Sequence, residues 1–367
     1  MASKKISYHQ LVDYDVADPA KVLAQKEGRA TAKNMPFGFS EIEGTRGESA
    51  YVFDMGDSYG ALVQEGLGTK SLIAQALYRE TGKSYFSEIA KDTVAAIIND
   101  LISVGATPVV SNAYWSSSSY KWLEDKGLTN GFIKGWRAAC DEANVVWGGG
   151  ETQALSGIVK EGALELAGSA FGIIKDKKRL VSESKLKDGD AIIFIESSGV
   201  HANGISLARE IADKAEKGYL TKLSDGRTFG EALLTPTHIY ANAINKLFEA
   251  GCELHYLSNI TGHGWRKIMR AGREFTYEIT NIPTPPSEFD FIAKYSGNNE
   301  KEMYGNYNMG AGYAVYLPEE DAQKAVDIIK KSGFNAWLAG NIKAGKKQVK
   351  INSKNITFEG SSLGVRS

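Results

Sequence analysis

The sequence predicts two domains, each built from both strands and helices. The chain has 367 residues, more than one hydrophobic core usually holds, so about 150 to 200 residues per domain are expected. Strand patterns and helix patterns alternate along both halves. Between the halves, residues 175–190 are charged and rich in turn formers, which is typical of a domain boundary. We therefore expect one domain over residues 1–175 and a second over residues 176–367.

Composition excludes several classes of protein. With 43 Lys+Arg against 44 Asp+Glu, the chain has no bulk positive charge of the kind that binds nucleic acid. No apolar run approaches the roughly 18 residues of a membrane span, and the first residues carry no readable targeting signal. Cys140 and Cys252 lie far apart without metal-ligand spacing. They favour two packed thiols in a reducing, cytoplasmic setting.

The first half opens with a strand pair that leads into a glycine-rich turn. Residues 50–55 and 59–64 are rich in β-formers around a Gly-Asp-Ser turn, which predicts a hairpin. The sequence EGLGTK then brings Glu65 and Lys70 around two glycines, in a loop that we expect to be exposed. Ser71 is the expected N-cap of the next helix, which ends near Gly82.

The residue types of EGLGTK suit phosphate and metal. Glycine backbones can turn toward an anion, and a lysine adds positive charge. A carboxylate can hold the Mg²⁺ that accompanies a nucleotide. The spacing of a P-loop is absent, so a purely structural turn is the alternative.

A helix is expected over residues 89–104, and its two faces differ. Apolar residues fall on one side at helical spacing, while Asp92, Asn99 and Asp100 share the other side with alanine. Carboxylates and an amide on one face can bind metal or nucleotide. A solvated surface is the other reading.

A third motif, GGGET, follows a helix expected over residues 132–143 and a short buried strand over residues 145–147. Three glycines followed by Glu151 and Thr152 can cradle an anion beside a metal ligand, or form a flexible loop. A strand over residues 164–174 ends this half.

The second half repeats the pattern of strand, polar loop and helix. A buried strand over residues 191–195 leads through SSGVHANG into a helix over residues 205–215, a geometry that often binds anions at the helix start. His201 in this loop is either a structural residue or a proton-transfer group. The segment 259–264 is another glycine turn, before a basic helix, and the tail predicts a strand, a helix and a strand.

The succession of motifs resembles one family. In order, the chain carries EGLGTK, DTVAAIINDLISVGATP, GGGET, SSGVHANGISL, LLTPTHIY, ITGHGW and EMYGNYNMGAGY. Over about residues 8–350 this resembles aminoimidazole ribonucleotide synthetase, also called phosphoribosylformylglycinamidine cyclo-ligase, of purine biosynthesis. The resemblance implies an α+β fold of two domains, with the amino-terminal sheets of two subunits closing a β-barrel across a homodimer. It also implies that the partner chain supplies some active-site residues.

The resemblance also implies a reaction, an ATP-dependent ring closure of formylglycinamidine ribonucleotide, with ATP and Mg²⁺ as cofactors and a small-molecule nucleotide as substrate. Four carboxylates are implied for Mg²⁺: Glu65, Asp92, Asp100 and Glu151. Eight residues are implied for ATP: Gly68, Thr69, Lys70, Asp92, Asn99, Gly149, Gly150 and Thr152. Seven are implied for substrate: Ser198, His201, Asn203, Thr261, Gly262, His263 and Asn308. Lys70 and His201 are the implied catalytic residues, His201 for proton transfer because imidazole titrates near neutral pH.

The chain departs from the family pattern at several positions, which indicates a divergent member. The family usually has aspartate where Glu65 stands, glycine at His263, and arginine at His238 and Gly305. A glycine-rich loop also usually stands where this chain has FGFSEI, residues 37–42. Losing two arginines removes bidentate contacts to phosphate or carboxylate, so we expect phosphate ligands at different positions.

Two alternatives belong to other functional classes. One is a related kinase or phosphate-transferring enzyme, such as a thiamine-monophosphate kinase-like or selenophosphate synthetase-like protein. No cysteine lies in a glycine-rich loop, against the selenophosphate branch, and none lies in the terminal GVRS, against a hydrogenase-maturation relative. The other alternative is a nucleotide-binding protein without catalysis.

Overall fold

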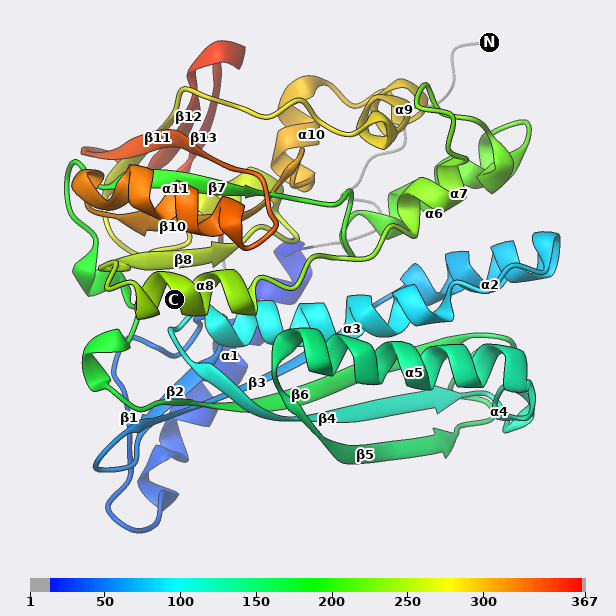
Figure 1. Cartoon of the computed structure of the whole chain (residues 1–367), viewed down its shortest axis with the longest axis horizontal. Coiled ribbons are helices and arrows are strands. Elements are labelled where there is room, and N and C mark those ends of the chain that lie inside the picture. The colour runs from blue at the N-terminus through cyan, green and yellow to red at the C-terminus, as the bar shows by residue number, and fades with distance from the viewer. Residues whose placement is uncertain (1–13, 365–367) are drawn as a thin grey trace.

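The computed structural model describes residues 14–364 and contains two β-sheets separated by helices (Figure 1). The first sheet has the strand order β1-β2-β3-β6-β4-β5. All neighbouring strands in it are antiparallel except β4 and β5, which are parallel. Its strands are β1 (Ser40–Glu41), β2 (Tyr51–Asp54), β3 (Tyr59–Gly66), β4 (Thr107–Ser117), β5 (Val146–Ala154) and β6 (Leu164–Ile174).

Helices cover one face of the first sheet and separate it from the second half (Figure 1). The helices of the first half are α1 (Tyr14–Ala30), α2 (Lys70–Thr81), α3 (Phe86–Ile102), α4 (Lys121–Glu124) and α5 (Lys126–Ala143). The predicted hairpin is confirmed as β2 and β3. The predicted N-cap at Ser71 is wrong, because α2 begins at Lys70 and the Ser71 hydroxyl donates to the Leu164 carbonyl at 2.9 Å. Gly82 ends α2 in the left-handed conformation.

The second sheet has the order β13-β12-β9-β11-β7-β10-β8. Its strands are β7 (Ala191–Glu196), β8 (Tyr256–Asn259), β9 (Phe275–Ile279), β10 (Ala311–Leu317), β11 (Ala336–Ala344), β12 (Gln348–Ile351) and β13 (Ile356–Glu359). The strand, helix and strand predicted for the tail are confirmed as β10, α11 and β11. Strands β10 and β11 both pair antiparallel with β7, which is fully apolar and buried from Ala191 to Ile195.

The helices of the second half are α6 (Ile205–Lys214), α7 (Phe229–Leu233), α8 (Ala241–Glu249), α9 (Ser287–Ser296), α10 (Glu300–Asn306) and α11 (Ala322–Lys331). Short 3₁₀ turns join these elements: η2 (Ala32–Asn34), η3 (Lys177–Arg179), η4 (Glu183–Lys185), η5 (Gly218–Leu220), η6 (Gly264–Met269), η7 (Glu319–Asp321), η8 (Asn352–Lys354) and η9 (Gly360–Ser362). Among residues 14–364, no helix is long and apolar enough to cross a membrane.

Helix α3 lies between the two halves, and this position explains its unusual polar face. One side of α3 packs on β3, β6 and α5, while the other contacts α8 and β8 of the second half. Asp92, Asn99 and Asp100 are consequently buried, at 0%, 1% and 9% exposure. The reading of this face as a solvated surface is therefore wrong.

Strand β5 corrects the prediction for GGGET. The motif is neither a loop nor a sequel to a buried strand, because residues 148–152 continue β5 at the edge of the sheet, and Val146 is 65% exposed. Gly150 has φ +159°, and a Cβ there would lie 2.0 Å from the Ala113 carbonyl oxygen. At that position the glycine permits close pairing with β4.

Candidate functional site

A cavity of about 370 Å³ lies where the end of β3 meets the second half. Polar side chains from three elements converge on it: Glu65 from the end of β3, Asp100 from α3, and Lys267 and Arg270 from η6 and the residue after it. Asn203, Asn259, Thr261 and Lys21 of α1 complete its polar lining. Ligand pockets commonly measure about 300–1,000 Å³, so this cavity can hold part of a nucleotide.

Two carboxyl groups, those of Glu65 and Asp100, line the cavity. Burial, followed by the charge of Asp100, raises the pKa of Glu65 to about 8, although Lys267 and Arg270 act in the opposite direction. Asp100 is held in place by Asn259, whose Nδ2 donates to Asp100 Oδ1 at 2.7 Å. At neutral pH, therefore, the pair retains a proton that an entering cation would displace.

Basic side chains also line the cavity. Burial, together with the charge of Arg270, lowers the pKa of Lys267 to about 7. The Arg270 Nη2 donates to the Gly47 carbonyl at 3.0 Å, and its Nε lies 3.5 Å from Glu48 Oε2. Glu48 also accepts a hydrogen bond from the Tyr256 hydroxyl at 3.0 Å. These contacts fix Arg270 at the cavity wall.

Lys70 occupies a different place from the one expected. It is fully buried, with its Nζ 2.8 Å from Asp92 Oδ2, and it donates to the carbonyl oxygens of His201 at 2.9 Å and Thr235 at 3.1 Å. Asp92 Oδ1 accepts from the backbone and hydroxyl of Thr237. The expectation of an exposed lysine is wrong, and Asp92 is committed to holding the two halves together.

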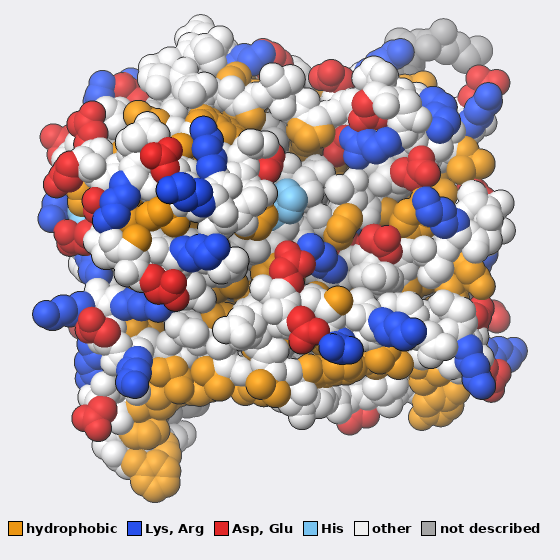
Figure 2. All heavy atoms as spheres, in the orientation of Figure 1, with side chains coloured by type: hydrophobic (Ala, Val, Ile, Leu, Met, Phe, Trp, Pro, Cys, Tyr) orange, Lys and Arg blue, Asp and Glu red, His pale blue; other side chains and the backbone are white. Residues whose placement is uncertain are grey.

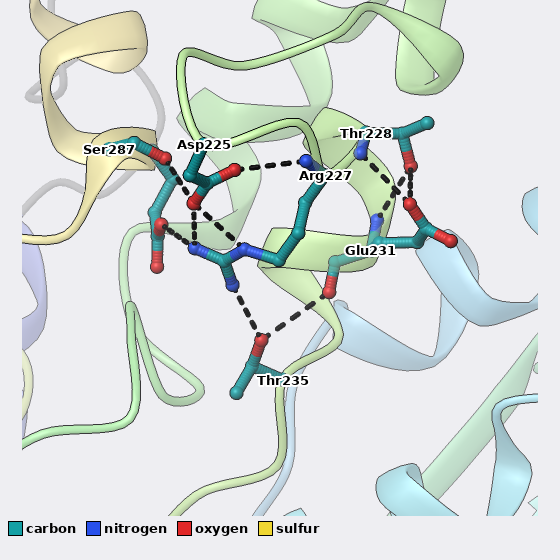
Figure 3. Close-up of polar contacts among 7 residues, drawn as sticks. Asp225, Arg227, Thr228, Glu231, Thr235 and Ser287 are labelled. Atoms are coloured by element: carbon teal, nitrogen blue, oxygen red, sulfur yellow. Dashed lines mark hydrogen bonds and ion pairs between the residues drawn. The ribbon is translucent and has the colours of Figure 1, made fainter.

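A polar cluster in the second half holds the segment that Lys70 contacts (Figure 3). Arg227 donates to Asp225 Oδ2 at 2.7 Å, to Glu288 Oε2 at 3.0 Å and to the Thr235 hydroxyl at 3.1 Å. Residue Thr235 thus links Arg227 through its side chain and Lys70 through its carbonyl. The buried Lys70 therefore connects the two halves and does not lie in an open phosphate-binding loop.

Asn99 also serves the interface between the halves. Its Nδ2 donates to the His238 carbonyl at 2.8 Å and its Oδ1 accepts from the Tyr240 backbone at 3.0 Å. Both polar ends of the amide are used within the chain, and ATP binding by Asn99 stays a prediction.

The loop before α6 divides into internal and cavity-lining residues. Ser198 donates its hydroxyl to the Pro236 carbonyl at 2.7 Å, and His201 is buried with its Nε2 accepting from the Ser198 backbone at 3.3 Å. Burial, followed by the charge of His238, lowers the pKa of His201 well below its usual value. Burial thus opposes protonation of this imidazole, and proton transfer by His201 stays a prediction. Of the predicted loop residues, Asn203 lines the cavity.

Three other predicted substrate residues lie nearby. Thr261 lines the cavity, whereas Gly262 and His263 do not. His263 is buried in the left-handed conformation, and burial lowers its pKa to about 3. Asn308 is turned inward, because it accepts from the Ser197 hydroxyl and the Gly310 backbone and donates to the Gly199 carbonyl. Its expected contact with substrate stays a prediction.

The predicted nucleotide and metal residues do not form one cluster. Gly66, rather than Gly68 or Thr69, lines the cavity. Gly149, Gly150, Glu151 and Thr152 lie on the edge strand β5. Among the described residues, no three Asp, Glu, His or Cys side chains gather as a metal site, and the role of the four carboxylates in metal binding stays a prediction. Glu65 and Asp100 remain together.

Comparison with known proteins identifies the family. Models of the AIR synthase related protein match in both halves, the N-terminal domain over residues 47–174 and the C-terminal domain over residues 187–352. A phosphoribosylformylglycinamidine cyclo-ligase of Methanocaldococcus jannaschii is 33% identical, covering 83% of this chain and 87% of the relative. The chain belongs to the AIR synthase related family. The resemblance seen in the motifs is thereby confirmed.

Solved structures agree at the level of the fold. A chain of the crystallised HypE-HypF complex has a TM-score of 0.63 and 20% identity, covering 92% of this chain and 98% of that chain. AaThiL complexed with AMPPCP and TMP has a TM-score of 0.59 and 14% identity, covering 97% and 98%. The mixed α/β architecture of an AIR synthase related protein is therefore present in both halves.

The departures from the pattern expected for AIR synthase related proteins have local structural counterparts. His238 lies half-buried against Phe334, with ring centroids 5.2 Å apart. At Gly305, a Cβ would lie 3.3 Å from the Phe358 ring. The Gly305 carbonyl instead accepts two hydrogen bonds from Arg266, at 3.0 and 2.8 Å. Neither position supplies an arginine to the cavity.

Sequence reasoning missed Lys267, Arg270 and Glu48 as site residues. A signal existed for the first two, because the sequence predicted a basic helix directly after ITGHG. The local sequence gave no signal for Glu48, because its contacts are with Arg270 and Tyr256 of the second half.

The carboxyl pair of this AIR synthase related protein predicts a pH effect on stability. The pKa of Glu65 rises from its ordinary value of 4.5 to about 8 in the folded chain, so the folded state holds a proton that the unfolded chain releases. The stabilising contribution is complete below about pH 4.5 and is lost as pH rises through 8. As pH rises from about 5 to 8, the free energy of unfolding of wild type should therefore fall by roughly 2–5 kcal/mol relative to that of Glu65→Gln.

Urea unfolding of the two proteins at pH 5, 6.5 and 8 measures this difference. If the free energies of unfolding of the two proteins change with pH in the same way, Glu65 titrates normally in the folded protein. Glu43→Gln supplies the control, because Glu43 does not line the cavity.

Proposed function

We propose that this chain converts formylglycinamidine ribonucleotide to aminoimidazole ribonucleotide in an ATP-dependent cyclisation of de novo purine biosynthesis. The observation that carries the proposal is the cavity itself, which is lined by the Glu65 and Asp100 carboxyl pair together with Lys267 and Arg270. A phosphoryl-transfer site needs this combination, because it must hold a metal and neutralise phosphate charge at once. The curated relative with 33% identity bears the name of this activity.

The chemistry is an activation followed by ring closure. The amide oxygen of the substrate attacks the γ-phosphorus of ATP, and ADP leaves. The internal nitrogen then attacks the activated carbon, and inorganic phosphate departs with the oxygen. The protein contributes positioning and charge neutralisation, for which Asn203, Asn259 and Thr261 supply neutral hydrogen-bonding groups at the cavity wall.

Mg²⁺ fits the carboxyl pair. Carboxylate oxygens are the ligands that Mg²⁺ prefers, and the ion is commonly held by one or two carboxylates together with substrate phosphates. Glu65 and Asp100 provide these two groups. When bound, the ion would neutralise the charge of the transferred phosphoryl group.

ADP release with and without formylglycinamidine ribonucleotide tests the proposal. A cyclo-ligase should release ADP only with this substrate and should form aminoimidazole ribonucleotide in equal amount. ATP consumption with thiamine monophosphate or selenide instead would favour the kinase-like alternative. Nucleotide binding without turnover on any of these would favour a non-catalytic protein.

A homodimer is part of the proposal, supported by the uncovered face of the first sheet. Directly paired residues form an apolar row across five strands: Tyr51, Leu62, Phe171, Val110 and Val146. Leu62 is 48% and Val146 is 65% exposed. Figure 2 shows hydrophobic side chains along the lower edge of the molecule, where this sheet lies. A second copy of the sheet would bury the row by closing the β-barrel that the family resemblance implies.

Replacing Leu62 by arginine should weaken this dimer. A charge in the middle of an apolar interface loses its hydration without gaining a partner, so the protein should sediment as a monomer at concentrations where wild type sediments as a dimer. Leu220→Arg is a matched control, because Leu220 is also exposed but lies on η5 in the second half. Wild type sedimenting as a monomer would contradict the proposal outright.

We propose domains over residues 1–175 and 176–367, supported by the two family models and the two sheets. We also propose that the β5 residues from Gly149 to Thr152 serve the partner's site, supported by their exposure at the sheet edge. Cys140 and Cys252 are free and buried, which supports a reducing, cytoplasmic setting.

A further inference from the structure

Lys267 is unusual among the charged residues of the described chain. Its side chain is 9% exposed and lines the cavity. Within residues 14–364, its ammonium group makes no hydrogen bond and no ion pair within 4.0 Å. A buried cation without a direct partner carries a cost in free energy. Such a group is retained where a ligand completes its environment.

The backbone around Lys267 is held firmly. The Ser258 hydroxyl donates to the Lys267 carbonyl at 2.9 Å, and the Tyr316 hydroxyl donates to the Ile268 carbonyl at 2.6 Å. Arg266, the preceding residue, is tied to the Gly305 carbonyl. These bonds to β8, β10 and α10 prevent η6 from turning Lys267 out to solvent.

The surroundings of Lys267 favour an anion. Arg270, three residues further along the chain, also lines the cavity, as does Lys21 of α1. The carboxyl groups in the cavity are already engaged in part: Glu48 faces Arg270, and Asp100 accepts from Asn259. A phosphate group entering the cavity would meet Lys267 and Arg270 directly and would leave Glu65 and Asp100 facing its metal.

We propose that Lys267 and Arg270 bind a phosphate group, and that they take the place of the arginines expected at His238 and Gly305. The inference rests on the proposed function, which supplies two sources of phosphate, ATP and the ribonucleotide substrate. Lys267 gives a point charge and Arg270 a planar fork, a combination suited to a dianionic phosphate.

Ligand binding tests the assignment without requiring turnover. The variants are Lys267→Met and Lys267→Gln, with Lys330→Gln on the exposed face of α11 as the control. Calorimetry with ADP plus Mg²⁺ and with ribose 5-phosphate measures the two phosphate sources separately, and ribose is the ligand without phosphate. Loss of one charge-assisted contact should raise Kd by roughly 10- to 100-fold for one or both phosphate ligands.

The affected ligand identifies the source of the phosphate, and a loss for both would place Lys267 between two phosphate groups. Kd values within twofold of wild type for both ligands would overturn the proposal. Thermal unfolding separates a structural role: Lys267→Met should keep or raise the Tm, because it removes a buried charge that makes no direct ion pair. A lower Tm in both variants would assign Lys267 to the fold and also overturn the proposal.

Binding without turnover keeps this test separate from that of the proposed function. If ADP release fails but Lys267-dependent phosphate binding persists, the cyclisation is wrong and the phosphate site stands. If turnover is normal and the Kd for phosphate ligands is unchanged in the Lys267 variants, the cyclisation stands and the phosphate site is wrong.

Discussion

Lys70→Ala should destabilise the protein by about 3–5 kcal/mol, because truncation leaves the buried Asp92 carboxylate without its countercharge. Both side chains of the pair have 0% exposure. The change also removes two hydrogen bonds, to the His201 and Thr235 carbonyls. We therefore expect a large fall in the midpoint of urea unfolding, with loss of activity following from loss of the docked arrangement.

A double variant distinguishes a structural role from a catalytic one. Lys70→Met combined with Asp92→Asn removes both charges and keeps side-chain volume, so it should recover much of the stability lost by Lys70→Ala. Lys91→Ala is the matched control, since its pair with Glu142 at 2.7 Å is partly exposed and should contribute below about 1 kcal/mol. A stable, inactive Lys70→Ala protein would contradict this account and would restore Lys70 to phosphate binding.

The sequence predicted most strands and helices because their signals are local. The hairpin of β2 and β3 has a Gly-Asp-Ser turn between β-formers, and β7 is a continuous apolar run. Helix α3 was found from its 3.6-residue period, within three residues at each end. Only the start of strand β5 was predicted, as a short strand over residues 145–147, because the glycine-rich sequence that follows has low strand propensity. Its pairing with β4 depends on a neighbour more than thirty residues away.

The site was predicted less well, for a physical reason. A polar residue beside glycines can face a ligand or another part of the protein, and only the docking of the two halves decides between them. Asp92 and Asp100 lie on the same helix face, yet Asp92 meets Lys70 and Thr237 while Asp100 meets the cavity. Likewise His201 and Asn203 share one loop, and only Asn203 lines the cavity.

Glu65→Gln should raise the Mg²⁺ concentration needed for half-maximal activity by at least about tenfold, whereas Glu65→Asp should raise it less. The glutamine keeps the shape of the side chain but loses the negative charge that attracts a hard cation. The aspartate keeps the charge and shortens the reach by one methylene. Charge should outweigh length because the second carboxylate, Asp100, is fixed by Asn259 and cannot move to compensate.

Steady-state ADP release over a Mg²⁺ titration at pH 8.5 measures this effect, since Glu65, with a pKa of about 8, is then mostly ionised in the free enzyme. The sign of the pH dependence adds a second check. Below pH 8 a proton competes with the metal in wild type, so the required Mg²⁺ should rise as pH falls, and Glu65→Gln should show a weaker dependence. If Glu65→Gln matches wild type at limiting Mg²⁺ across this range, the metal is bound without Glu65, and the raised pKa reflects burial alone.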